Sequence, residues 1–284
     1  MRIDSHQHFW RYDATRHAWI TDKMSTLKQD FLPSDLDPAL NANGIDATIL
    51  VQVDQTEEET LFLLRLAEHN ANIAGVVGWI DFCSSQVEGR LRYFSQFEKL
   101  CGFRHIAQGE SDDRFLVRDD FTRGIACLQQ FGFIYEILIY PKQLPAALEL
   151  VMRFPEQAFV IDHMAKPEIR AKEEANWTAA MREIAANPNV SCKVSGLVTE
   201  ADWHHWKKED FRPYLDVVFD AFGPERLMFG SDWPVCLLAA SYGQVLQIIE
   251  EYVHGYPAEV KERIFGGNAA QFYGLKTARH GFAA

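Results

Sequence analysis

Apolar runs recur eight times along this chain, and segments with helical periodicity separate them. Most of the runs are near-continuously apolar rather than alternating, which is typical of parallel strands covered on both faces. Strands that alternate with helices in this way indicate parallel βαβ units. The predicted strands are residues 1–4, 47–53, 73–80, 102–107, 133–139, 158–162, 190–194 and 227–230.

Two of the intervening helices have clear local signals. Thr56, followed by three glutamates, starts a capping-box pattern in front of apolar positions with helical spacing. A second apolar stripe ends at Gly223 and Pro224, which stop a helix, and its aromatic members are typical of a core rather than a cofactor pocket. This stripe consists of Phe211, Leu215, Val218, Phe219 and Phe222.

The eight strand–helix units close most economically into a (β/α)8 TIM barrel, an α/β fold with its active site at the C-terminal strand ends. The segment around residues 19–31 predicts an extended first βα excursion. A doubly wound open sheet is the alternative, but no Gly-x-Gly-x-x-Gly motif follows any predicted strand. Because no linker-like or low-complexity stretch divides the chain, we expect a single domain over residues 1–284.

Composition and charge narrow the class of protein further. With 284 residues and 48% hydrophobic content, the chain can bury one large core. Its formal net charge of −12 opposes attraction to phosphate backbones, so nucleic acid is not an expected partner. The five cysteines are widely separated and form no Cys-x-x-Cys pair, which argues against a disulfide framework and a thiolate zinc site.

The sequence carries no signal for a membrane or for export. No apolar run approaches the roughly 18 residues that a membrane-spanning helix needs. At the N-terminus, Asp4, His6 and His8 interrupt any apolar region of the signal-peptide kind. We therefore expect a cytoplasmic protein without membrane partners, and the sequence leaves homo-oligomerisation open.

Three predicted strand ends carry residues that suit one chemical site. His6 and His8 are two residues apart and so share one face of a strand, where two imidazoles suit a divalent metal or a polarised carbonyl. For this pair alone, two hydrogen-bonded structural histidines are an equally good interpretation. His163 and Asp232 favour the site, because each lies where a distant apolar run ends in polar residues.

Four motifs spread over nearly the whole chain carry a resemblance to a known family. They are Asp-Ser-His-Gln-His-Phe-Trp at 4–10, Asp-His-Met-Ala-Lys-Pro at 162–167, Gly-Ser-Asp-Trp-Pro at 230–234 and Gly-Gly-Asn-Ala-Ala-Gln-Phe-Tyr-Gly-Leu at 266–275. These motifs resemble the amidohydrolase superfamily. More narrowly, the chain is similar to its amidohydrolase-2 branch, which contains sugar lactonases of the L-fuconolactonase and L-rhamnonolactonase type.

The resemblance implies a set of catalytic residues, namely His6, His8, His163 and Asp232, which would also be the ligands of a single Zn²⁺ if a divalent ion is bound. Binuclear members carry a bridging lysine on the fourth strand and two later histidines, whereas the fourth strand here offers Arg104. A two-metal site is therefore not expected. Because branch members related to lactonases also work without a metal, we expect that no cofactor is required.

The activity implied by the resemblance is that of a hydrolase. It would open a sugar lactone, an aldonolactone such as L-fuconolactone, to the sugar acid by attack of an activated water. Asp232 would act as the base, while the histidines hydrogen-bond the carbonyl oxygen. The expected partner is therefore a small-molecule lactone. A metal-dependent nonoxidative decarboxylase of the same branch is the alternative.

Several residues are candidates for binding the hydroxyl groups of such a substrate, since a polyhydroxylated ring needs fixed donors and acceptors at the barrel mouth. For Arg104 an ion pair at the barrel end is an equally good interpretation, and for Trp10 ordinary packing is the slightly better one. Ser231 would point to the opposite face of its strand from Asp232. The candidates are Arg104, Lys166, Glu110, Tyr140 and Trp10.

Overall fold

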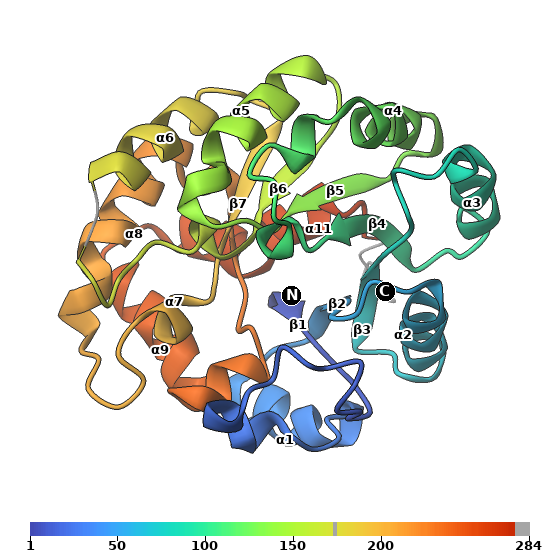
Figure 1. The fold of residues 1–284 in the computed structure, drawn as a ribbon. Helices are drawn as coiled ribbons and strands as arrows, with labels where there is room; N and C mark the ends of the chain where they lie inside the picture. The colour runs from blue at the N-terminus through green and yellow to red at the C-terminus, as the bar shows by residue number, and fades with distance from the viewer. Residues whose placement is uncertain (173–174, 276–284) are drawn as a thin grey trace, which may run out of the picture.

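The structure is a computed structural model that describes residues 1–172 and 175–275. Eight parallel strands form one sheet in the order β1 to β8, with helices around it (Figure 1). The barrel closes at the C-terminal ends of the first and last strands, where His8 N donates to Trp233 O at 2.7 Å and Asp232 N donates to His6 O at 2.9 Å. The predicted (β/α)8 barrel is confirmed. Its strands are β1 (Ile3–Gln7), β2 (Ala47–Val51), β3 (Ile73–Gly78), β4 (Leu100–His105), β5 (Ile134–Ile137), β6 (Phe159–Ile161), β7 (Val190–Val194) and β8 (Leu227–Phe229).

Helices follow the strands and cover the outside of the barrel (Figure 1). The predicted excursion after β1 is present and contains a short 3₁₀ helix, Asp22–Leu27. The predicted cap also forms, because Thr56 Oγ1 accepts a hydrogen bond from Glu59 N at 3.2 Å. The helices are α1 (Pro33–Asn43), α2 (Glu57–His69), α3 (Val87–Phe94), α4 (Asp119–Leu128), α5 (Leu144–Arg153), α6 (Ala175–Ala185), α7 (Leu197–Glu200), α8 (Lys208–Phe222), α9 (Tyr242–Tyr252), α10 (Ala258–Glu262) and α11 (Asn268–Phe272).

Two apolar clusters form the core. The larger one includes the predicted apolar stripe of α8 and lies between the sheet and the helices. The smaller one draws on strands around the barrel and on α11, with members such as Ile3, Ile49, Val77, Val160 and Met228. Burial of apolar surface of this kind is the dominant favourable contribution to folding. Among the described residues, no helix combines the length and the apolar character that a membrane crossing requires.

The first strand continues beyond the point predicted from the sequence. All five residues of β1 are buried, although four of them are polar. Each polar side chain is accepted in the interior because it finds a partner there: Gln7 Nε2, for example, donates to Thr48 Oγ1 at 3.0 Å. His6 therefore lies inside the barrel wall, while His8 follows the strand at the mouth.

Candidate active site

A cavity of about 460 Å³ opens at the C-terminal ends of the strands, in the size range of small-molecule sites. Trp19 and Met24, from the excursion after β1, and Leu238, after β8, provide part of its apolar lining. Two of the few large exposed aromatic side chains, Trp19 and Tyr140, belong to the lining. The titratable and polar residues that line the cavity are His8, Arg104, Gln108, Tyr140, His163, Lys166, Thr199, Glu200 and Asp232.

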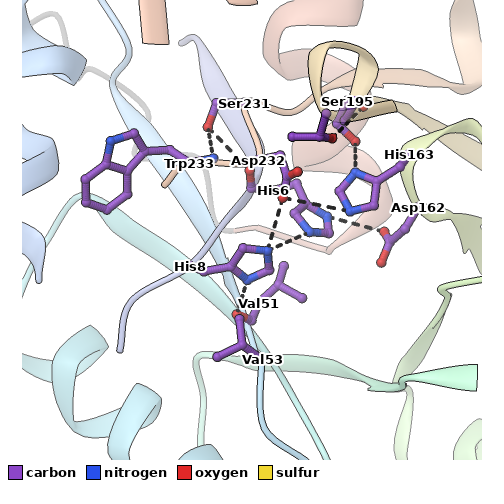
Figure 2. Close-up of polar contacts among 12 residues, drawn as sticks. His6, His8, Val51, Val53, Asp162, His163, Ser195, Ser231, Asp232 and Trp233 are labelled. Atoms are coloured by element: carbon purple, nitrogen blue, oxygen red, sulfur yellow. Dashed lines mark hydrogen bonds and ion pairs between the residues drawn. The ribbon is translucent and has the colours of Figure 1, made fainter. Parts of the chain in front are cut away.

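Three of the predicted catalytic residues converge at the base of this cavity, and the fourth lies beside them (Figure 2). His6 Nε2 lies 3.2 Å from His8 Nε2, and His8 Nε2 lies 3.3 Å from Asp232 Oδ1. His163 Nε2 is 3.9 Å from the same carboxylate oxygen. All four residues are buried. The structure thus brings together the four residues that the sequence placed at three different strand ends.

The protonation states follow from burial and from neighbouring charges. Burial lowers the pKa of His6, His8 and His163, because the charged imidazolium is poorly solvated there. Burial alone would raise the pKa of Asp232, but His163, His8 and Lys166 outweigh it, and the pKa lies below the usual value. Near neutral pH the site therefore contains an ionised Asp232 among neutral imidazoles.

The tautomer of His8 is fixed by the backbone. His8 Nδ1 lies 2.7 Å from Val51 O, and since a carbonyl oxygen only accepts, this nitrogen carries the proton. In the neutral ring, Nε2 then presents a lone pair toward Asp232. His8 can accept a hydrogen bond from a water or bind a cation, but it cannot donate to a substrate carbonyl.

Hydrogen bonds to Asp4 connect β1 to the segment that carries Asp232. Its carboxylate accepts hydrogen bonds from Ser231 N at 2.9 Å, Ser231 Oγ at 2.5 Å, Tyr242 OH at 3.0 Å and His6 N at 3.1 Å. The Ser231 hydroxyl is therefore engaged with Asp4, next to Asp232 in the chain. Because Asp232 has a φ of +57°, this fixed neighbour helps to hold it in the left-handed region.

His163 begins a left-handed turn that directs it into the cavity. The φ angles of His163, Met164, Ala165 and Lys166 are +51°, +52°, +56° and +50°. Residues other than glycine adopt this region at a cost of about 1–2 kcal/mol each. The surroundings support the turn, since Trp177 Nε1 donates to Met164 O at 2.8 Å. His163 Nδ1 also lies 2.9 Å from the Ser195 hydroxyl (Figure 2).

Replacing Ala165 with glycine is expected to be unusually well tolerated. Ala165→Gly and Ala147→Gly, the latter in α5, both remove a fully buried methyl group and both increase the freedom of the unfolded chain. Only Ala165→Gly also relieves a left-handed conformation. We therefore expect its loss of unfolding free energy to be about 1–2 kcal/mol smaller than that of Ala147→Gly. Urea unfolding of both variants measures the difference, and equal losses would contradict a strained turn.

His6 is supported from below by a buried network of charges. Lys193 Nζ lies 3.1 Å from His6 Nδ1, 3.2 Å from Asp162 Oδ1 and 2.6 Å from Glu136 Oε1. Arg104 contributes a second cation, with Nη1 2.9 Å from Asp162 Oδ2 and 3.3 Å from His6 Nε2. Burial opposes ionisation of Asp162, but Lys193, His6 and Arg104 hold its pKa well below the usual range. The network fixes the ring of His6.

The residues predicted to bind substrate separate into two groups. Arg104, Lys166 and Tyr140 line the cavity, whereas Glu110 and Trp10 are not among its lining residues. Glu110 Oε1 instead lies 2.7 Å from His105 Nε2, in the turn after β4. Trp10 is buried, packs edge-on against Phe31 and donates from Nε1 to Gln29 O at 2.9 Å. Both positions fit a packing role.

Sequence reasoning missed several residues of the site. Asp162 and Glu136 complete the charge network, and Glu200 and Gln108 line the cavity. A signal for Glu136 was present, because it is a lone carboxylate inside an apolar strand, a position that needs a buried partner. Glu200 had no comparable signal, since a glutamate in a short helix after a strand is usually solvated.

The site contains a suitable ligand set for one divalent ion. One ligand atom each from His6, His8 and Asp232 lies within 4.8 Å of the others. Ligands around a tetrahedral zinc ion lie about 3.3 Å apart, since each is about 2.0–2.1 Å from the metal. The separations of 3.2 and 3.3 Å in this set match that value. His163, which was predicted as a fourth ligand, is not part of this converging group.

Comparison with known proteins agrees with this architecture. The fold and the site define an α/β barrel protein in which the ends of the first and last strands bring two histidines and an aspartate together. A family model described as amidohydrolase matches residues 3–275. The chain belongs to the amidohydrolase family.

Two named relatives align over almost their whole length. A Burkholderia multivorans protein named L-fucono-1,5-lactonase is 45% identical over 286 residues, covering 97% of this chain and 96% of that protein. A Burkholderia ambifaria protein of the same name is 37% identical, covering 96% and 95%. The crystal structure of a Burkholderia multivorans amidohydrolase with bound zinc has a TM-score of 0.94 at 45% identity and covers 97% and 100%. A Sphingomonas paucimobilis 5-carboxyvanillate decarboxylase, at 15% identity and a TM-score of 0.66, shares the fold alone.

Proposed function

We propose that this protein is a lactonase that hydrolyses the ester bond of a sugar lactone, with L-fucono-1,5-lactone or a close aldonolactone as substrate. Relatives with that name support the reaction class over nearly the entire chain. The structural observation that carries the proposal is an ionised Asp232 beside His8 and His163 at the base of a sugar-sized cavity. A buried base next to uncharged hydrogen-bonding groups is what water attack on a lactone needs.

The charges of the cavity also favour a neutral substrate. Of its two lining cations, Arg104 pairs with Asp162 at 2.9 Å, and Lys166 pairs with Glu200 at 3.7 Å. A substrate carboxylate would need a cation whose charge is not already balanced by a protein carboxylate. A sugar lactone carries no charge and is accommodated without breaking either pair. This balance favours the lactone over the aromatic carboxylate that a decarboxylase would bind.

Each residue of the site has its own role in the proposed hydrolysis. Asp232 removes a proton from the attacking water, which His8 Nε2 helps to orient by accepting its second hydrogen bond. When the Ser195 hydroxyl donates to His163 Nδ1, the ring proton lies on Nε2, and His163 donates to the developing oxyanion. The proton held by Asp232 then passes to the departing ring oxygen. The product is the open-chain sugar acid, whose carboxyl group then ionises and releases one proton.

We also propose that a metal ion is not required. His6, His8 and Asp232 would hold a divalent ion, which would act as a Lewis acid and lower the pKa of a nearby water. However, Arg104 Nη1 already lies 3.3 Å from His6 Nε2, the nitrogen that such an ion would use. The guanidinium thus places a fixed positive charge at the base of the site. An ester carbonyl is also more electrophilic than an amide, so hydrogen bonds suffice.

Chelation is therefore expected to leave most of the lactonase activity. The test compares initial hydrolysis rates of the protein as purified, after treatment with a chelator, and after addition of Zn²⁺. Elemental analysis of each sample verifies the metal content. If activity disappears on chelation and returns with Zn²⁺, the metal-free proposal is wrong.

The reaction itself is tested by its products. A pH-indicator assay with a panel of aldonolactones is expected to detect proton release, and NMR should show the sugar acid, corrected for spontaneous hydrolysis. A parallel assay measures CO₂ from aromatic carboxylates such as 5-carboxyvanillate. Release of CO₂ without hydrolysis of any lactone would replace the lactonase proposal with the decarboxylase.

A further inference from the structure

We propose that Lys166 and Glu200 act together as a diol-binding pair, which selects lactones that carry two neighbouring ring hydroxyls beside the carbonyl group. This inference rests on the proposed lactonase function and goes further by assigning the part of the substrate that determines specificity. The pair lies on the cavity wall, and its two residues come from the loop after β6 and from α7, after β7.

The pair is held in place but remains open to a ligand. Lys166 Nζ lies 3.7 Å from Glu200 Oε1 and 5.5 Å from the centre of the Tyr140 ring. A charge-assisted hydrogen bond is about 2.7–2.9 Å long, so the direct contact is loose. Their side chains are 18% and 23% exposed, which leaves both within reach from the cavity. Lys166 and Glu200 therefore keep free capacity to donate and to accept.

Arg104 shows the contrast between a fixed and an available cation. Its guanidinium contacts Asp162, His6 and Gln52 O, and the residue is only 2% exposed. Its donors are largely engaged inside the barrel wall. Of the two cations in the cavity lining, Lys166 is thus the one available to a substrate hydroxyl.

The left-handed turn places this pair next to the reacting centre. Lys166 N donates to His163 O at 2.8 Å, which closes a turn of the 3₁₀ type. With three residues per turn, side chains at positions i and i+3 lie on the same side. Lys166 therefore stands beside His163, which donates to the lactone oxyanion in the proposed mechanism. The hydroxyls nearest to the carbonyl carbon are the ones within its reach.

A second lining residue independently indicates a hydroxylated ligand. Gln108 Oε1 is buried and has no hydrogen-bond partner among the residues that the structure describes. An acceptor in that state is unfavourable by about 1–3 kcal/mol unless a ligand or water donates to it. A hydroxyl group both donates and accepts, so a diol satisfies the Lys166 ammonium and the Glu200 carboxylate at once. A third ring hydroxyl can donate to Gln108.

The test compares lactones that differ in their hydroxyl groups. We would measure kcat/KM for L-fucono-1,5-lactone, its 2-deoxy analogue and unsubstituted δ-valerolactone, using Lys166→Met, Glu200→Gln and the double variant. Each single substitution should lower kcat/KM for the hydroxylated lactone about 10- to 150-fold and change δ-valerolactone less than about threefold. The double variant should lose less than the product of the single losses, because the two residues act as one unit.

Lys208→Met and Glu251→Gln are matched control substitutions. This exposed pair joins α8 and α9 with an Nζ–Oε1 distance of 2.5 Å and does not line the cavity, so all three lactones should react as in the wild type. Equal losses of the two substrates in the Lys166 and Glu200 variants would overturn the inference, as would no loss with either. If the wild type hydrolyses no lactone, the proposed function itself fails. Thermal unfolding of each variant separates loss of binding from loss of fold.

Discussion

Asp232→Asn is expected to lower kcat for lactone hydrolysis by about 10²–10⁴-fold, because the amide cannot take a proton from the attacking water. Its size is preserved, and asparagine tolerates the left-handed backbone at this position, where φ is +57°. The pKa of Asp232 lies below the usual value, so the wild type keeps its base ionised at neutral pH. Steady-state kinetics on an aldonolactone at neutral pH measures the loss.

Asp220→Asn provides the matched control for this experiment. Asp220 lies on α8, exposed and paired with Arg182 at 2.5 Å, and it does not line the cavity. Its variant should keep wild-type kinetics. Circular dichroism and thermal unfolding should show that Asp232→Asn remains folded. A folded variant with near-wild-type kcat would remove Asp232 from the mechanism.

The main elements of the fold, and the convergence of the candidate catalytic residues, were predictable from local sequence. Continuous apolar runs specify buried parallel strands, and a polar residue at the end of such a run is visible without any three-dimensional information. His8, His163 and Asp232 stand at such ends. His6 was found for a different reason, since it shares a strand face with His8, although it proves to lie within the barrel wall.

The partners of these residues were not predictable in the same way. Lys193 contacts Glu136 across 57 positions of sequence and His6 across 187, so no local pattern joins them. Glu110 shows a second reason: it follows β4 closely in the sequence, yet its carboxylate contacts His105, and the residue does not line the cavity. Loop geometry decides such cases. For the same reason, Glu200 becomes visible as a lining residue only in the folded chain.

The buried network below His6 is expected to dominate stability as well as to orient the ring. Lys193→Met leaves Glu136 and Asp162 without their shared cation, in a place where all three side chains are fully buried. Breaking a buried pair on one side typically lowers the free energy of unfolding by about 3–5 kcal/mol. Tyr273 OH, 2.5 Å from Glu136 Oε1, compensates only partly, because it supplies a hydrogen bond but no charge.

Adding Glu136→Gln to Lys193→Met should restore much of this stability. The double variant removes both charges of the pair, while Asp162 keeps Arg104 at 2.9 Å. Burial first, and then the charge of Asp162, raise the pKa of Glu136 above its usual value. Because the pKa of Glu136 is higher in the folded than in the unfolded protein, the unfolding free energy falls as pH rises between the two pKa values. Loss of Lys193 raises the folded-state pKa further and extends this fall to higher pH.

Urea unfolding of the two variants between about pH 5 and pH 9 tests this account. The unfolding free energy of Lys193→Met should keep decreasing toward alkaline pH, and Glu136→Gln should remove that decrease. If the double variant is no more stable than Lys193→Met alone at alkaline pH, Glu136 is not the charge that Lys193 neutralises. The principal role of Lys193 would then be its contacts with Asp162 and His6. In that case, adding Asp162→Asn to Lys193→Met should change the loss of stability.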